Sequence, residues 1–145
     1  MLRQLVIGAA VSLGNIAIHA AMMTAIIRSK SAIHANVWQH PSLRLIGIMV
    51  ATVSMLMAAH LVEIAVWAIA YWFAGVTPAG TENLYFAFVN YTTLGYGDIV
   101  PVARWRLLGP LTAMNGVLLF GWSTAVIFHV LRRSVPPDDE RALPR

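Results

Sequence analysis

Hydrophobic residues gather in three long stretches, separated by shorter and more polar segments. They run from Leu5 to Ile27, from Leu43 to Phe73 and from Trp105 to Leu131. As an α-helix the first would be about 35 Å long, against a hydrocarbon core of roughly 30 Å. The second, about 46 Å long by the same rise, must tilt or project beyond the lipid. The pattern predicts three transmembrane helices.

A fourth segment, residues 82–92, is apolar but too short to cross a bilayer. We interpret it as a re-entrant helix, with Thr81 as a candidate N-cap and Glu82 near the positive end of the helix dipole. Irregular backbone at membrane depth is tolerated only where protein buries it or where it lines water. The loop that follows this segment must therefore meet one of those two conditions.

The most specific pattern in the chain is that loop, with the sequence Thr-Thr-Leu-Gly-Tyr-Gly-Asp over residues 92–98. Taking a cation out of water is costly unless other oxygens replace its hydration shell. Backbone carbonyls can do so if successive residues point them toward one axis, which requires backbone conformations of alternating handedness. Gly95 and Gly97 remove the steric penalty at alternate positions. The loop is therefore predicted to bind a dehydrated cation.

Composition agrees with a membrane protein. Of the 145 residues, 59% are hydrophobic and 11% are charged, and the mean hydropathy is +0.70. Without cysteine the chain has no disulfide framework, thiolate metal site or cysteine nucleophile. The net charge of +4 comes from basic residues at the ends of the apolar stretches, so we expect a lipid bilayer and no nucleic acid as partner.

Basic residues also predict the orientation. Arg28, Lys30 and Arg44 lie in the first connection, which has no acidic residue, and Arg132 and Arg133 follow the last stretch. By the positive-inside rule both segments are cytoplasmic, which places the N-terminus and the Gly-rich loop outside. The predicted location is the plasma (inner) membrane, crossed several times.

Residues 1–21 have a competing interpretation as a cleaved signal peptide. Arg3, an apolar core and the run Ala17-Ile18-His19-Ala20 fit that pattern loosely. Because the apolar residues continue to Ile27 and basic residues follow, a retained helix is favoured.

From about Leu45 to Leu131 the chain resembles the two-span pore module of prokaryotic potassium channels. The resemblance rests on the 92–98 motif and on Gly116 and Gly121, which are followed by Ser123-Thr124-Ala125. It implies an all-α membrane protein with three transmembrane helices, a re-entrant pore helix and a selectivity-filter loop, assembled as a tetrameric channel. The resemblance implies an additional N-terminal helix at 1–30, a cytoplasmic basic loop at 31–44, a pore domain at 45–131 and a short cytoplasmic tail at 132–145. Within the pore domain it implies an outer helix at 45–74, a pore helix at 82–92, a filter at 92–98 and an inner helix at 105–131.

The resemblance also assigns ligands to the permeant ion. K⁺ would bind the carbonyl oxygens of Thr93, Leu94, Gly95 and Tyr96 and the Thr93 hydroxyl, with Gly97 completing the filter. The chain has one copy of the motif, so a ring of carbonyls requires a homotetramer. No cofactor is expected, with K⁺ as the permeant ion. Leu94 stands where valine is commonest in the family, and we expect this to alter packing behind the filter more than ion choice.

Side chains behind the filter are expected to brace it. In related channels the filter tyrosine and aspartate are tied to pore-helix side chains, and the corresponding positions here include Tyr85 and Asn90. We hypothesise that Asn90 holds the Tyr96 hydroxyl and that Tyr85 holds Asp98. Thr92 belongs to the same supporting set.

Candidate gating residues lie on the last stretch. Gly116 and Gly121 permit either a hinge or close helix packing, and the sequence does not choose between them. Phe120 and Phe128 are candidates for a hydrophobic constriction.

Two features of the first two stretches remain. His60 and Glu63, three residues apart, are either a structural contact or a proton-sensing pair, and as a metal site the pair lacks further ligands. A stripe of small residues suits packing of the first helix against another helix of the channel or against an unknown partner. The stripe consists of Ala10, Gly14, Ala17, Ala21 and Ala25.

The expected function is passive, potassium-selective conduction across a membrane, and not enzymatic catalysis. The alternative is a potassium-transport subunit, or a pore that is regulated by a partner protein and does not conduct alone.

Overall fold

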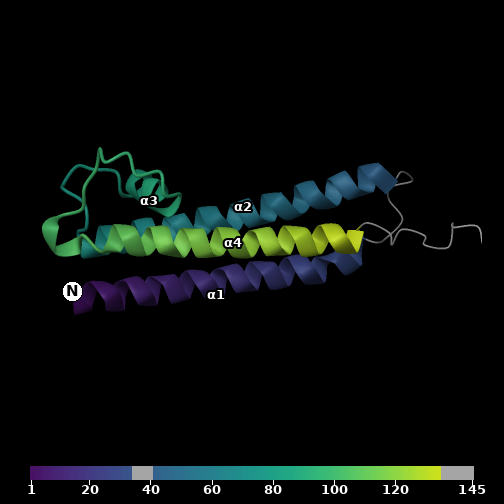
Figure 1. Cartoon of the computed structure of the whole chain (residues 1–145), viewed down its shortest axis with the longest axis horizontal. Coiled ribbons are helices and arrows are strands. Elements are labelled where there is room, and N and C mark those ends of the chain that lie inside the picture. The colour runs from purple at the N-terminus through teal and green to yellow at the C-terminus, as the bar shows by residue number, and fades with distance from the viewer. Residues whose placement is uncertain (34–40, 135–145) are drawn as a thin grey trace, which may run out of the picture.

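The computed structural model describes residues 1–33 and 41–134, and over these the fold is all-α. Helices α1, α2 and α4 run alongside one another, while the short α3 lies beside α2 and α4 near one end (Figure 1). All three long helices are long and apolar enough to cross a membrane. The predicted fold class, an all-α membrane protein with three spanning helices, is confirmed. The elements are α1 (Leu2–Ile33), α2 (Pro41–Ala74), α3 (Asn83–Tyr91), the 3-10 turn η1 (Ala103–Trp105) and α4 (Leu108–Ser134).

The long helices start and end at points that the hydropathy pattern did not locate. α2 begins at Pro41 instead of residue 45, and α1 continues to Ile33, so the described parts of the expected 31–44 loop are largely helical. The inner helix begins at Leu108 instead of residue 105, because η1 forms a separate turn before it. The remainder of that loop, 34–40, and the expected tail over 135–145 lie outside the described residues.

The start of α3 also differs from the prediction. Glu82, not Thr81, is the N-cap residue, and no side chain caps the helix there. The Thr81 hydroxyl instead donates to the Pro78 carbonyl at 2.6 Å, within the preceding turn. Hydroxyl side chains form such local bonds to the backbone in turns, in competition with capping.

Two glycines let α3 approach α4 closely. A Cβ added at Gly116 would lie 2.1 Å from the carbonyl oxygen of Tyr91, and one added at Gly109 would lie 2.9 Å from the side-chain oxygen of Asn90. The glycines are seven residues apart, so they share one face of α4. Of the two roles left open for Gly116, the structure supports close packing.

The buried interior consists of two apolar clusters with polar side chains between them. One cluster lies at the α3 end and includes Trp67 and Phe86, and the other lies toward the opposite end and includes Leu56 and Val130. The polar side chains between the clusters come from all four helices and are fully or largely buried. Five of them, linked by hydrogen bonds, are called the buried network below: His19, His60, Glu63, Tyr91 and Ser123.

α1 packs on α2 and α4 through a face that the small-residue stripe did not predict. All five stripe residues, Ala10 to Ala25, are exposed. The buried face carries Asn15, His19 and Met23, and near the N-terminus Gly8 lies directly against Leu111. Polar side chains inside a membrane must find partners. Asn15 and His19 therefore fix the rotation of α1, and the small residues face away from the chain's own helices.

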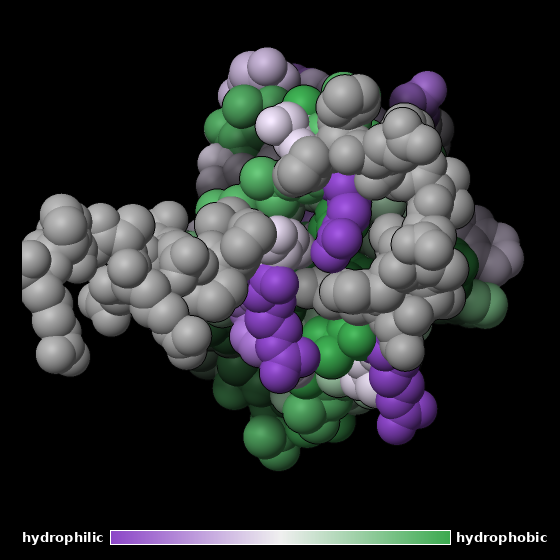
Figure 2. Space-filling model, turned by 90° about the vertical axis from the view of Figure 1, so that its right-hand side faces the viewer, coloured by the Kyte–Doolittle hydropathy of each residue, from purple (hydrophilic) through white to green (hydrophobic). Residues whose placement is uncertain are grey.

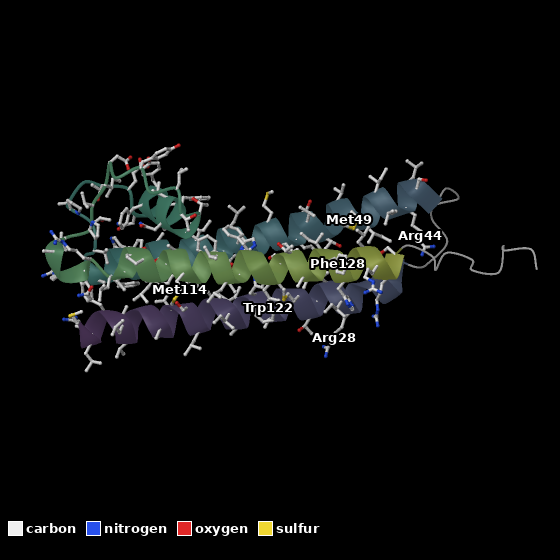
Figure 3. All side chains as sticks on the ribbon, viewed as in Figure 1. Arg28, Arg44, Met49, Met114, Trp122 and Phe128 are labelled. Carbon is white, nitrogen blue, oxygen red and sulfur yellow. The ribbon has the colours of Figure 1, made fainter. Side chains whose placement is uncertain are left out.

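The end of the molecule opposite α3 is basic. Arg28 and Arg44 lie there (Figure 3), as do Arg132 and Arg133 at the end of α4. No acidic residue among the described ones accompanies them. A view onto this end shows strongly hydrophilic side chains, with hydrophobic ones beside them (Figure 2).

Candidate functional site

The backbone of residues 93–97 alternates in handedness. Thr93, Gly95 and Gly97 have positive φ angles of 59°, 58° and 76°, whereas Leu94 and Tyr96 between them do not. Positive φ is unusual for a residue with a Cβ, so Thr93 holds a conformation that costs of order 1–3 kcal/mol. Alternation of this kind turns successive carbonyls toward the same side of the segment, which a row of cation ligands requires.

Hydrogen bonding in this segment uses the amide groups and leaves the carbonyls free. The N–H groups of Thr93, Leu94 and Gly95 all donate to carbonyls of α3, at 3.0, 2.9 and 3.4 Å. Across residues 1–33 and 41–134, no hydrogen bond ends on the carbonyl oxygens of residues 93–96. The N–H donors are thus bonded to α3 and the carbonyl acceptors are free, an arrangement that suits the binding of a cation.

Residues 92–98, called the filter segment below after their expected role, are exposed on the single chain. The side chains of Leu94 and Tyr96 are 54% and 68% accessible. Non-helical backbone at membrane depth does not face lipid. This surface must therefore border either protein or water when the chain is in a bilayer.

Tyr85 and Asp98 meet behind the filter, as the sequence hypothesis requires. The Tyr85 hydroxyl donates to Asp98 Oδ2 at 2.6 Å, and the Ile99 N–H donates to Asp98 Oδ1 at 3.0 Å. The hydrogen bond from Tyr85 holds the pKa of the Asp98 carboxyl below its ordinary value, and the same bond raises the pKa of Tyr85. The contact joins α3 to the C-terminal end of the 92–98 segment.

The expected contact between Asn90 and Tyr96 is not formed within one chain. The Asn90 amide instead donates to the Phe86 carbonyl of its own helix at 2.7 Å. Thr92 behaves similarly, since its hydroxyl donates to the Phe88 carbonyl at 2.7 Å. Both side chains thus cap the C-terminal turn of α3 rather than reach the filter side chains.

The centre of the buried network is Glu63 on α2, which is 0% exposed. His19 Nδ1 of α1 lies 2.7 Å from Glu63 Oε1, and His60 Nδ1 lies 3.0 Å from Oε2. The Tyr91 hydroxyl also donates to Oε2. One carboxylate inside the membrane therefore accepts from three side chains on three helices, which offsets the cost of burying its charge.

Ser123 of α4 closes the network on its other side. Its hydroxyl oxygen lies 3.0 Å from His60 Nε2 and 3.2 Å from His19 Nε2. Both imidazoles thus lie between Glu63 and Ser123. Because Tyr91 is the last residue of α3 and directly precedes the filter, the network supports the base of the filter loop.

A second group of polar contacts lies one to about two turns away along the three long helices, on the side of the α1 N-terminus. Asn115 Oδ1 accepts from Asn15 Nδ2 at 3.1 Å and from Trp67 Nε1 at 3.0 Å. Asn15 Nδ2 also donates to the Glu63 carbonyl at 3.2 Å. α1 is therefore joined to α2 and α4 by hydrogen bonds at both Asn15 and His19.

The remaining gating candidates lie on one continuous helix, since α4 runs through both glycines. Gly121 has no atom within 4 Å of an added Cβ, which leaves its role as a hinge a prediction. The Phe120 ring lies against His60 and Tyr91, with ring centroids 4.6 and 5.4 Å apart. Phe120 therefore covers the network from the α4 side.

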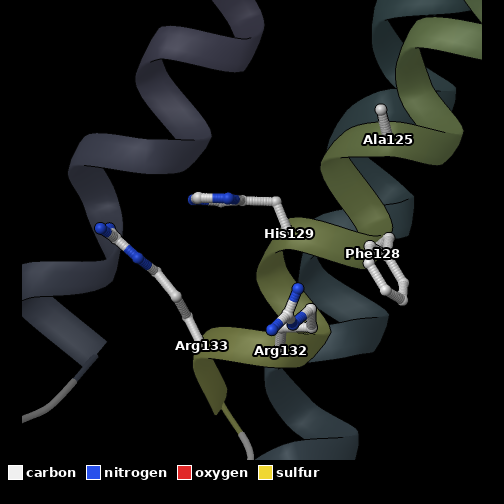
Figure 4. Close-up of a pocket in the computed structure, with 5 residues that line it drawn as sticks. All are labelled: Ala125, Phe128, His129, Arg132 and Arg133. Atoms are coloured by element: carbon white, nitrogen blue, oxygen red, sulfur yellow. The ribbon is translucent and has the colours of Figure 1, made fainter.

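Phe128 lines a pocket near the end of α4 with cationic side chains. His129 and Arg133 point toward α1 there, while Arg132 and Phe128 point in another direction (Figure 4). The Arg132 guanidinium lies 5.8 Å from the centre of the Phe128 ring. A constriction at Phe128 stays a prediction, since its side chain is 59% exposed on the single chain.

Sequence analysis identified part of the network and missed the rest. The contact between His60 and Glu63 was expected and is present, and a proton-sensing role for the pair stays a prediction. The sequence did not connect the pair with His19, Tyr91 or Ser123. Each of these residues lies 28 to 63 positions along the chain from the member of the pair that it contacts. The available signal in the sequence was the presence of Asn15 and His19, four residues apart, within an apolar span, because polar residues within a span need partners.

Comparison with known proteins identifies the class. A protein-family model described as an ion channel matches residues 59–133, which is more than half of the chain. The chain belongs to this ion channel family. Neither the curated proteins nor the solved structures contain a match to it. The matched region includes α3, the filter segment and nearly all of α4, whereas α1 lies outside it.

Proposed function

We propose that this ion channel is selective for potassium and that its filter is formed by residues 93–97 of four identical chains. The observation that carries the proposal is the free row of carbonyls at residues 93–96, on a backbone of alternating handedness whose N–H groups are bound to α3. Carbonyl rings of this kind replace the hydration shell of K⁺.

One chain supplies ligands on one side of the ion only. The segment is also exposed along its whole length, although it is irregular backbone next to a membrane-spanning bundle. Closed rotational symmetry meets both requirements, because further copies surround the ion and cover the exposed loop. The proposed assembly is a homotetramer in a lipid bilayer, and mass measurement of the detergent-solubilised complex tests the number of chains.

Ion flux into vesicles tests selectivity. The purified protein, reconstituted alone, is expected to conduct K⁺ in strong preference to Na⁺. Equal flux of both ions would refute a selective filter. Absence of any flux would favour the alternative of a transport subunit or a pore that needs a partner protein.

A matched pair of glycine substitutions tests the filter itself. Gly97→Ala adds a methyl group where φ is +76°, whereas Gly47→Ala adds the same group within α2. Neither methyl group would have another atom within 4 Å in the chain, so the pair differs mainly in backbone handedness. The positive φ costs about 1–2 kcal/mol per alanine. We expect Gly97→Ala to lose selective K⁺ flux and Gly47→Ala to retain it.

The proposed orientation places the basic end in the cytoplasm and the filter outside. The filter end also carries Arg3, Arg104 and Arg106, but there Glu82 and Asp98 accompany them. Because the chain has no cysteine, single cysteines at Ala79 and Ser42 report on each end separately. A membrane-impermeant maleimide applied to intact cells should label Ala79→Cys and not Ser42→Cys, and the reverse pattern would overturn the orientation.

A further inference from the structure

The buried network holds donor atoms of the types that zinc prefers. Ligand atoms of His19, His60 and Glu63 all lie within 4.8 Å of one another. Zn²⁺ binds imidazole nitrogen and carboxylate oxygen at about 2.0–2.2 Å, and two imidazoles with one carboxylate are a known zinc donor set. The sequence pair His60 and Glu63 lacked a third ligand, and the fold supplies it from α1. We propose that this cluster binds a divalent transition metal of the zinc type.

The positions of the donor atoms suit one ion. His19 Nδ1 lies 2.7 Å from Glu63 Oε1, and His60 Nδ1 lies 3.0 Å from Oε2. Ligands of a tetrahedral zinc ion lie about 3.4 Å apart, so a small outward movement of the rings makes room for the ion in place of the two Nδ1 hydrogens. The Tyr91 hydroxyl, 2.9 Å from His60 Nδ1, borders the site, and the three donors leave the fourth position of a tetrahedral ion open.

Ser123 provides an independent argument. Without a metal, a carboxylate can only accept, so both Nδ1 hydrogens are directed at Glu63. If both rings are neutral, they present two Nε2 acceptors to Ser123, whose hydroxyl has a single hydrogen, so one Nε2 atom lacks a donor unless one ring is protonated. With a metal on both Nδ1 atoms the ring hydrogens move to Nε2, and the two lone pairs of Ser123 Oγ accept both of them. Metal-binding histidines are typically oriented by a hydrogen bond of this kind from the other ring nitrogen.

The surroundings hold the proposed ligands in fixed positions. The His19 and Glu63 side chains are 0% exposed and come from different helices, so their positions are set by the packing of α1 on α2. His60 keeps 13% exposure and gives the ion a route of entry. The ligands lie within the bundle and not on the filter, so the site is separate from the proposed potassium ligands and does not depend on them.

Metal content tests the site directly. The full-length protein, purified without a histidine tag and equilibrated with micromolar free Zn²⁺, is expected to retain one zinc ion per chain. Glu63→Gln and His19→Gln should each lose that ion. His129→Gln is the matched control, because His129 is exposed near the end of α4 and outside the cluster, and it should leave the zinc content unchanged.

Ser123→Ala guards against variants that fail to fold, because it keeps all three proposed ligands. Loss of an outer hydrogen bond of this type lowers metal affinity by about 10–100-fold, and that decrease is the expected result. Zinc content that is absent in the unaltered protein, or equal in Glu63→Gln and His129→Gln, would overturn the proposal. Neither measurement depends on ion flux, so failure of the metal site and failure of the potassium filter are distinguishable.

Discussion

The filter segment and the buried network differ in what one chain can complete. Residues 92–98 are exposed and present free carbonyls, whereas Glu63 and His19 are fully buried and every contact they make lies within the chain. The two regions meet at Tyr91, which donates to Glu63 and directly precedes the filter. The buried network links the four helices of one chain, whereas the filter segment would complete an ion site only in the proposed tetramer.

The difference also predicts how the two regions respond to substitution. Damage to the network should lower the stability of each chain. Damage to the filter should alter conduction while the helices remain folded, because the loop contributes no residue to either apolar cluster. The substitutions below test this separation.

Glu63→Leu should have the largest effect. It leaves His19 Nδ1, His60 Nδ1 and the Tyr91 hydroxyl without their acceptor, and removing one partner of a buried charged pair costs about 3–5 kcal/mol. We expect a large decrease in the midpoint of thermal unfolding in detergent. Glu82→Leu is the control, because Glu82 is exposed, and its midpoint should stay close to that of the unaltered protein.

If Gly97→Ala lowered the unfolding midpoint as much as Glu63→Leu does, the filter would be part of what stabilises the chain. The separation between the two regions would then be wrong.

Gly116→Ala should have an intermediate effect. The added Cβ would lie 2.1 Å from the Tyr91 carbonyl oxygen, so α3 must move away from α4, and overpacking of this kind costs about 1–3 kcal/mol. Gly121→Ala is the matched control on the same helix, since it meets no atom within 4 Å and favours helix by up to about 1 kcal/mol. Unfolding midpoints of the two variants should move in opposite directions. Equal midpoints would argue against close packing at Gly116.

Tyr85→Phe should have the smallest effect, since both partners of its hydrogen bond are exposed. The pKa of Asp98 lies below the ordinary value of about 3.9, so its contribution to stability is present above that pH and is lost as the pH falls through the lowered pKa. Without the Tyr85 hydroxyl the pKa should rise toward its ordinary value. A pH titration of the Asp98 carboxyl carbon by NMR measures this shift.

Tyr71→Phe serves as the control for that titration. It removes a hydroxyl bonded to Thr112 in the core, away from the filter, and should leave the Asp98 titration curve in place. A curve that stays in place for Tyr85→Phe as well would show that Tyr85 does not brace Asp98.

The sequence predicted the features that depend on consecutive residues. Three spans follow from hydropathy, and the alternating backbone follows from glycines at every second position, although positive φ at Thr93 adds a position that no glycine marks. The contact of Tyr85 with Asp98 was expected from the resemblance, and its partners lie only 13 residues apart, on α3 and on the loop that follows it. These features need no knowledge of how the long helices pack.

Features that depend on helix rotation could not be predicted in the same way. The small-residue stripe on α1 is not the face that packs within the chain, because the partners of Asn15 and His19 lie on helices whose register the sequence does not give; packing of the stripe against another subunit or a partner stays a prediction. The choice between hinge and packing at Gly116 likewise depended on the approach of Tyr91, 25 positions earlier in the chain. Long-range contacts of this kind emerge only from the packed structure.

The contact between His19 and Ser123 spans 104 residues, and this has a consequence for how the chain is made. α1 is synthesised before α4, so Ser123 and Asn115, which its polar side chains contact, leave the ribosome about 100 residues after them. Glu63 of α2 can contact both Asn15 and His19 earlier, but until α4 arrives His19 Nε2 lacks its contact with Ser123, and lipid does not replace it. Insertion into the membrane and final folding are therefore separate events for this helix, and α1 can dock completely only after α4 has arrived.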